Sequence, residues 1–283
     1  MSHLEWVFRP EVARPLVICA FAGWNDGGEA ATTTVRYLKD QWGARRFAGL
    51  DPEEFYDFQV HRPTVRLLDG ITRRVDWPSN DLFHAQPGGR DVVLFLGVEP
   101  NTRWRTYCDA ILRVASEFDA EALVTLGAFL ADVPHTMAAP VSAASADPDW
   151  LERPEIEPVR YEGPTGITGV LNDAAANVGL AAVSLWAAAP HYLPTGTNPR
   201  VALALLEALR DLFGLEVDTA DMARAAVVWQ RQVSEAIEED GNLQDYVRRL
   251  EEASSERGDV GRLPDADDLA AEVERYLRDR DDG

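Results

Sequence analysis

Lysine is almost absent from this chain: 26 of its 27 basic residues are arginine, and Lys39 is the single lysine. A P-loop requires a Gly-Lys-Ser/Thr sequence to hold phosphates, and neither glycine-rich turn of the chain supplies one. Schiff-base chemistry requires a desolvated lysine, whereas Lys39 lies in the polar sequence KDQW. The sequence therefore disfavours both mechanisms.

Cysteines and long apolar runs are also scarce. Cys19 and Cys108 are the only two cysteines, and both fall in apolar patterns, so we expect buried, reduced thiols rather than a disulfide framework. No apolar run approaches the ~18 residues of a membrane span, and residues 1–15 lack the regions of a signal peptide. We therefore expect a cytoplasmic protein without a membrane partner.

Positive charge is in deficit, since the formal net charge is −21. Nucleic acids and anionic membranes are polyanions and are disfavoured as partners. The deficit is uneven: residues 216–283 hold 20 acidic residues and 9 arginines, a far higher density of negative charge than in residues 1–215. This shift predicts a boundary near Leu215, with a core domain at 1–215 and an acidic helical C-terminal arm at 216–283.

Short apolar runs alternate with helical patterns along the first 215 residues. Four runs are typical of buried strands, at residues 16–22, 92–96, 122–126 and 181–188, although the last is alanine-rich enough to be helical. Helical composition or spacing occurs at residues 29–41, 101–118, 171–178 and 199–213. This alternation predicts an α/β fold with a mainly parallel sheet between helices.

Three segments depart from this alternation. Asp69-Gly70 lies between two short alternating runs, a pattern that indicates an antiparallel hairpin with a two-residue turn. Residues 134–164 hold six prolines, and we expect a long surface loop there. In the arm, apolar residues recur at helical spacing through Leu250, and residues 269–277 predict a further helix.

Polar residues follow each of the four expected parallel strands. In open parallel sheets, ligands bind outside the carboxyl ends of the strands. We therefore expect a common cleft for ligand or subunit contact, lined by Trp24, Asn25, Asp26, Glu99, His135 and His191. Simpler roles stay open for each of them: Asn25, Asp26 or Glu99 caps a helix, and each histidine is exposed or bonded locally.

Other site chemistries find less support. The two histidines stand 56 residues apart without the short ligand spacing of a zinc site, so we expect no metal. A G-x-S-x-G nucleophile elbow is missing, and no pattern indicates a cofactor. The sequence GPTGITG, with Thr165 and Gly166 before an expected helix, is similar to an anion-binding turn.

Six segments occur in a recognisable order within residues 10–215: FAGWNDGGEA (21–30), EEFYDF (53–58), LGVEP (96–100), LGAFLADVPHT (126–136), PTGITGVL (164–171) and APHYLPTGTNP (189–199). Together they resemble the proteasome-assembly-chaperone family, chaperone-2 type, whose bacterial members occur largely in actinobacteria. The resemblance implies an α/β sandwich related to nucleoside phosphorylase and hydrolase folds. It also implies a homo-oligomer, often a trimer, with proteasome subunits as a partner class. Archaeal relatives that bind proteasomes end in a hydrophobic-Tyr-X tail, whereas this chain ends RDRDDG.

Two functions remain open at this point. The first, which we favour, is a non-enzymatic assembly-chaperone-like or scaffold protein, as the family resemblance and the acidic arm indicate. The second is an enzyme acting on a nucleoside-like or other small polar substrate in the strand-end cleft. In that hypothesis Asp26 or Glu99 is the base and His135 or His191 is the acid, and its support from the fold is analogy alone.

Overall fold

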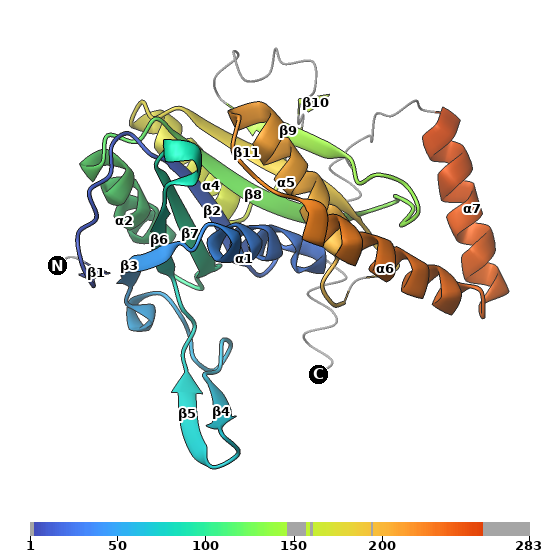
Figure 1. The fold of residues 1–283 in the computed structure, drawn as a ribbon, viewed down its shortest axis with the longest axis horizontal. Helices are drawn as coiled ribbons and strands as arrows, with labels where there is room; N and C mark the ends of the chain where they lie inside the picture. Colours follow the sequence, from blue (N-terminus) through green and yellow to red (C-terminus); the bar gives the residue numbers. More distant parts are fainter. Residues whose placement is uncertain (1–2, 146–156, 159–160, 194, 257–283) are drawn as a thin grey trace.

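Figure 1 shows the computed structural model of the protein, which describes residues 3–145, 157–158, 161–193 and 195–256. A nine-stranded mixed sheet has the strand order β1-β3-β6-β7-β2-β8-β11-β9-β10, and β4 and β5 form a separate two-stranded sheet. The strands are β1 Leu4–Trp6, β2 Leu16–Ala22, β3 Arg45–Leu50, β4 Thr64–Leu68, β5 Thr72–Asp76, β6 Asp81–Ala85, β7 Val92–Val98, β8 Ala122–Ala131, β9 Val141–Ser145, β10 Glu157–Pro158 and β11 Ala182–Pro190.

The four expected strands form the centre of the large sheet. Strands β7, β2, β8 and β11 pair in parallel, in that order. The alanine-rich segment at 182–190 is therefore a strand, with Ser184 opposite Thr125 of β8 in the register. The predicted α/β class with a mainly parallel centre is confirmed.

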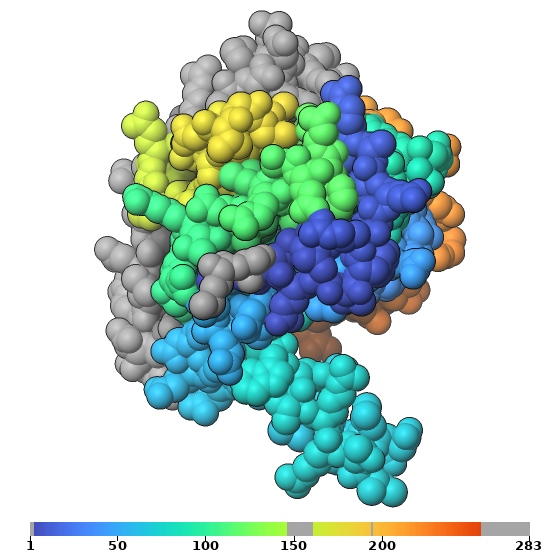
Figure 2. All heavy atoms as spheres, turned by 90° about the vertical axis from the view of Figure 1, so that its left-hand side faces the viewer, coloured from blue at the N-terminus to red at the C-terminus, as the bar shows by residue number. Residues whose placement is uncertain are grey.

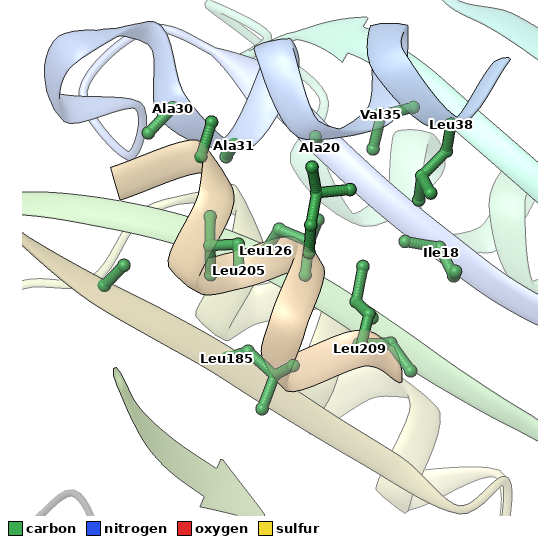
Figure 3. Packing of buried hydrophobic residues seen from close by; sticks show 14 of the residues in the cluster. Ile18, Ala20, Ala30, Ala31, Val35, Leu38, Leu126, Leu185, Leu205 and Leu209 are labelled. Carbon is green, nitrogen blue, oxygen red and sulfur yellow. The ribbon is translucent and has the colours of Figure 1, made fainter. Parts of the chain in front are cut away.

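Helices cover both faces of the sheet, as Figure 1 shows. The α-helices are α1 Ala30–Gln41, α2 Trp104–Glu117, α4 Ile167–Asn177, α5 Pro199–Phe213, α6 Ala220–Ile237 and α7 Gly241–Glu256, and short 3₁₀ turns lie at Gly27–Glu29, Pro52–Glu54 and Pro87–Gly89. Because side chains alternate along a strand, Ile18 packs with α1 and α5 while Cys19 packs with α2 and α4. Figure 3 shows the first of these two cores, where Leu205 and Leu209 of α5 face the sheet.

Helix α5 illustrates how local sequence sets the ends of an element. Pro199 occupies its first turn, where a missing N–H costs little. The Asn198 side chain accepts hydrogen bonds from the N–H groups of Arg200 and Val201, at 3.1 and 3.2 Å. Gly214 ends the helix in the left-handed conformation, with φ +63°, which glycine adopts without a Cβ penalty. The helix predicted at 199–213 is confirmed at both ends.

Two expectations for the segments outside this centre need correction. Residues 134–164, expected as a surface loop, contain β9, which pairs antiparallel with β11. The β9 sequence VSAAS holds small and polar residues, so its pairing comes from the open backbone edge of β11 rather than from an apolar pattern. The predicted hairpin is present, but Leu68 pairs with Thr72, so the turn holds three residues rather than two. The left-handed φ angles of Asp69 and Gly70 accommodate this turn.

The arm begins as part of the core. Leu215 and Met222 are buried in the same cluster as α1 and α5, and the Trp42 indole N–H donates to the carbonyl of Glu216 at 2.9 Å. Helices α6 and α7 are separated at Asp240, whose carboxylate accepts from the N–H of Asn242. The helix predicted at residues 269–277 lies outside the described residues. Among the described helices, none is long and apolar enough to cross a membrane.

Candidate functional site

The parallel pairing of β7, β2, β8 and β11 brings their carboxyl ends to one edge of the sheet. The chain segments that leave this edge carry all six residues predicted for the cleft. Trp24, Asn25 and Asp26 follow β2, Glu99 follows β7, and the two histidines follow β8 and β11. Trp24 is half-buried, whereas Asn25 and Asp26 are buried. Hydrogen bonds divide these residues into three groups, so the common cleft stays a prediction.

Asn25 and Glu99 form the first group. The side-chain amide nitrogen of Asn25 donates to Glu99 Oε1 at 2.8 Å. The side-chain oxygen of Asn25, Oδ1, accepts from the Thr168 hydroxyl at 3.1 Å. Asn25 is only 1% exposed, so both ends of its amide require partners within the protein. This pair therefore ties the end of β2 to the end of β7 and to the first turn of α4.

The predicted anion turn lies at the beginning of α4 and contacts this pair. The N–H of Ile167 donates to Glu99 Oε1 at 2.8 Å. Gly166, the residue before the helix, lies directly against the Asn25 amide, where a Cβ would come within 2.3 Å of it. An N–H at a helix N-terminus favours negative charge, and here the chain's own Glu99 carboxylate supplies it. Binding of an external anion at Thr165 and Gly166 stays a prediction.

Asp26 belongs to a second group, with the beginning of α1. Its carboxylate accepts from the backbone N–H of Ala31 at 2.7 Å and from the Thr32 hydroxyl at 2.5 Å. Burial raises the pKa of Asp26, while the hydrogen bonds from Thr32 and Ala31 oppose that rise. The sequence left open that Asp26 caps the first helix, and these contacts show it accepting hydrogen bonds at the beginning of α1.

The glycines of the same stretch allow close backbone approach. A Cβ on Gly27 would lie 3.1 Å from the carbonyl oxygen of Ala128 in β8. Gly28 has φ +59°, and a Cβ there would lie 2.8 Å from the Asn198 Cβ. The Asn198 N–H donates to the Gly28 carbonyl at 2.7 Å. This turn therefore joins β8 and the N-terminus of α5.

His135 and His191 form the third group, beneath α6 and α7. The Tyr192 hydroxyl lies 2.8 Å from His135 Nδ1, and the Ser234 hydroxyl of α6 lies 3.0 Å from His135 Nε2. His191 Nδ1 lies 3.1 Å from Asp132 Oδ1, and its ring packs edge-on against Tyr246 of α7. The two histidines thus attach the arm to the carboxyl edge of the sheet.

Arg200 strengthens this attachment. Its guanidinium donates to the carbonyl oxygen of Met137 at 2.6 Å and to Gln230 Oε1 of α6 at 2.6 Å. Burial lowers the pKa of Arg200. The Thr136 hydroxyl also donates to the Glu251 carboxylate of α7. Polar contacts from the strand-end loops and α5 therefore reach both helices of the arm.

Several residues of these groups were not predicted from the sequence, among them Thr168, Tyr192 and Arg200. Tyr192 directly follows His191, so a hydroxyl next to a strand-end histidine was a usable signal. Thr168 lies two residues after Gly166 and could have been read as part of the helix N-terminus. Arg200 had no such signal, because its partners Met137 and Gln230 are distant in the chain.

The His135 contacts predict a pH-dependent stability. Burial lowers the pKa of His135, with Arg200 adding to that effect and Glu251 opposing it. In the unfolded chain the histidine pKa is near 6.5. At pH values between 6.5 and the lowered pKa of folded His135, the unfolded chain therefore binds more protons than the folded chain. The stability from neutral His135 is fully present above about pH 6.5 and is lost as pH falls through the lowered pKa.

Urea unfolding of the wild type and of His135→Asn, from pH 7.5 to 5, tests this expectation. The asparagine variant does not titrate, so the stability difference between the two proteins should shrink as pH falls. Parallel stability curves across that range would contradict the assignment.

The described residues offer little for metal or covalent chemistry. No group of three histidine, cysteine, aspartate or glutamate side chains among them is arranged to hold a metal ion. Cys19 and Cys108 are free and buried. Burial raises the pKa of both thiols, that of Cys108 to about 12, so both stay protonated. The ionisable residues at the strand ends instead bind neighbouring helices.

Comparisons with known proteins agree with this fold. The sequence model of the PAC2 family matches residues 20–237. A PAC2 family protein from Streptomyces avermitilis has a crystal structure with TM-score 0.77 and 44% sequence identity, covering 82% of this chain and 99% of that chain. A proteasome-assembly chaperone homologue from Mycobacterium tuberculosis has TM-score 0.75 and 44% identity over the same shares.

A more distant structure shares the fold alone. An archaeal homologue of proteasome-assembly chaperone from Pyrococcus furiosus has TM-score 0.61 and 18% identity, covering 88% of this chain and 99% of that chain. A search of curated proteins finds no match.

Proposed function

The chain belongs to the PAC2 family, and on that premise we propose that it is a non-enzymatic, assembly-chaperone-like scaffold that holds other protein chains. The observation that carries this proposal is that the ionisable residues at the strand ends form hydrogen bonds to neighbouring helices. Asp26, Glu99 and His135 hold α1, α4 and α6 in place. An enzyme would need some of these groups free to contact a substrate.

Two further observations support a role in binding protein. The relative from Mycobacterium tuberculosis, at 44% identity, is named a proteasome-assembly chaperone homologue. Large apolar side chains are exposed on the β4–β5 hairpin and on α6, and such side chains are frequent in protein interfaces. Proteasome subunits are therefore the partner class that we propose, in the cytoplasm.

The proposal includes a homo-oligomer of three copies and a division of the chain at Leu215. Residues 1–215 form the α/β core in this scheme, and residues 216–283 form an arm that contacts a partner or another copy. The support for an arm is that α7 lies at one end of the molecule, beyond α6 (Figure 1). The packing of Met222 on α1 and α5 indicates that the arm also stabilises the core.

Affinity purification of the tagged protein from its native cell, followed by mass spectrometry, tests the proposed function. We expect proteasome subunits to be enriched over a tag-only control, because a chaperone of this kind binds them stably enough to be recovered. Native mass spectrometry of the same sample serves as the second readout. A retained small molecule, with no enriched protein, would contradict the scaffold and favour the enzyme on small polar substrates.

A further inference from the structure

The β4–β5 hairpin projects away from the body of the protein, as Figures 1 and 2 show. Its strands pair only with each other and do not join the nine-stranded sheet. Every residue of β4 and β5 is exposed except Asp76, which is half-buried. The core therefore contributes little to holding this hairpin, and an isolated two-stranded hairpin is marginally stable in water.

The register gives the hairpin two different faces, because directly opposed residues lie on the same side of a strand pair. One face carries Val65 opposite Val75, and Leu67 opposite Arg73. Of these side chains, Val65 is 56% exposed, Val75 is 48% exposed and Leu67 is 58% exposed. This is the apolar face of the hairpin, and Ile71 at the turn extends it with 86% exposure.

The opposite face is mainly polar, although it also carries Leu68, which is 44% exposed and lies opposite Thr72. Thr64 lies opposite Asp76, and Arg66 lies opposite Arg74. Asp76 forms ion pairs with both arginines. The hairpin thus has one mainly apolar face, which is open to water, and one mainly polar face, whose charged side chains pair with each other. Clusters of exposed apolar side chains often mark interaction sites, and this face carries such a cluster.

Charge identifies what docks there. Residues 60–77 contain four arginines and two aspartates, a net charge of +2 in a chain whose net charge is −21. A basic hairpin on an acidic protein attracts acidic surfaces. A second copy of this chain is such a surface, and it is present wherever the protein is.

Helix α6 is the part of a second copy that matches the hairpin. Val227 and Val228 are 67% and 45% exposed, and they are adjacent. The two arginines near them on α6 are paired with acidic residues: Arg224 with Asp221 and Arg231 with Glu235. Residues 220–256 carry nine acidic residues and four arginines, a net charge of −5. Helix α6 itself is charge-balanced, and the net charge of −5 comes from residues 238–256, which follow it. The α6 surface therefore offers apolar contact beside an acidic segment.

We propose that the apolar face of the β4–β5 hairpin in one copy packs on the Val227–Val228 surface of α6 in a second copy. Within one chain, the hairpin and α6 project from different sides of the core (Figure 1), so the contact joins two copies. The two contacting surfaces differ, which makes the contact head to tail. A head-to-tail contact that closes on itself produces a ring, the geometry required by a trimer.

Cysteine cross-linking tests which surfaces meet. The native cysteines are buried, so Ile71→Cys and Val227→Cys can be prepared separately, mixed and oxidised. A disulfide requires Cβ atoms about 4 Å apart. We expect a covalent dimer in the mixture and none in either variant alone. A dimer from Ile71→Cys alone would show that hairpins pair with each other and would overturn the proposal.

Light scattering tests whether the apolar face holds the assembly. Val75→Glu places a charge on the apolar face, and we expect it to raise the dissociation constant at least about tenfold, as loss of a central apolar contact does. Thr72→Glu is the matched control, because it adds the same charge on the polar face. A wild type that remains at the 31.3 kDa monomer mass, or equal effects of the two variants, would overturn the proposal. Neither readout depends on recovery of proteasome subunits, so this contact can fail while the proposed binding of proteasome subunits stands.

Discussion

Replacing Glu99 by alanine is expected to lower the free energy of unfolding by about 2–3 kcal/mol, because it leaves buried donors without an acceptor. The variant removes the oxygen that accepts from both the Asn25 amide and the Ile167 N–H. Asn25 is 1% exposed, so water does not readily replace the lost partner. Urea unfolding followed by circular dichroism measures the change.

Glu99→Gln is the matched control for this prediction. Its carbonyl oxygen still accepts a hydrogen bond at the position of Oε1, while its negative charge beside the α4 N-terminus is lost. We expect a smaller loss of about 1 kcal/mol, the scale of a helix-dipole interaction. Equal losses in the two variants would mean that charge, rather than the acceptor, holds these elements together. A loss below about 1 kcal/mol in Glu99→Ala would contradict the role of Glu99.

Gly28→Ala is expected to be at least as destabilising, because two penalties combine at one position. A left-handed backbone costs a residue with a Cβ about 1–2 kcal/mol, and Gly28 has φ +59°. The added Cβ would also lie 2.8 Å from the Asn198 Cβ, and overpacking costs about 1–3 kcal/mol. We expect a total loss of about 2–5 kcal/mol.

Gly43→Ala separates these two penalties. Gly43 has nearly the same backbone, with φ +57°, but nothing lies within 4 Å of an added Cβ. This variant should therefore lose only the backbone contribution, about 1–2 kcal/mol. In thermal unfolding, each 1 kcal/mol lowers Tm by roughly 2–4 °C in a protein of this size. Similar Tm values for the two variants would show that Asn198 can move aside at little cost.

Some elements could be predicted from local sequence patterns and others could not. Residues 16–22 and 199–213 were predicted with the bounds that the structure has, because a buried apolar run and a capped amphipathic helix carry their signals within a few residues. Strand β9 was missed because VSAAS lacks such a signal and forms by pairing with the edge of β11. The separation of α6 from α7 at Asp240 was also not predicted.

The strand-end residues show the same limit. Parallel topology allowed the prediction that Asn25, Glu99 and His135 lie at one sheet edge. The sequence left open whether Asn25 and Glu99 face a ligand or cap a helix. It also left open whether His135 faces a ligand or is exposed or bonded locally. The structure shows each of them bonded within the protein, Asn25 to Glu99 and His135 to Ser234. The hydrogen-bond partners are far away in the chain, so only folding brings them together.

Sequence by itself determined the layer architecture, the acidic composition of residues 216–283 and the presence of the hairpin. These features depend on apolar periodicity, charge density and the backbone preferences of glycine and proline, all of which act over short stretches of chain. The tertiary structure decided the partners of the polar residues. Asn25 and Glu99 are 74 residues apart, and His135 and Ser234 are 99 residues apart. No local pattern encodes such pairs, because a buried polar group takes whichever partner the packing of distant elements places within reach.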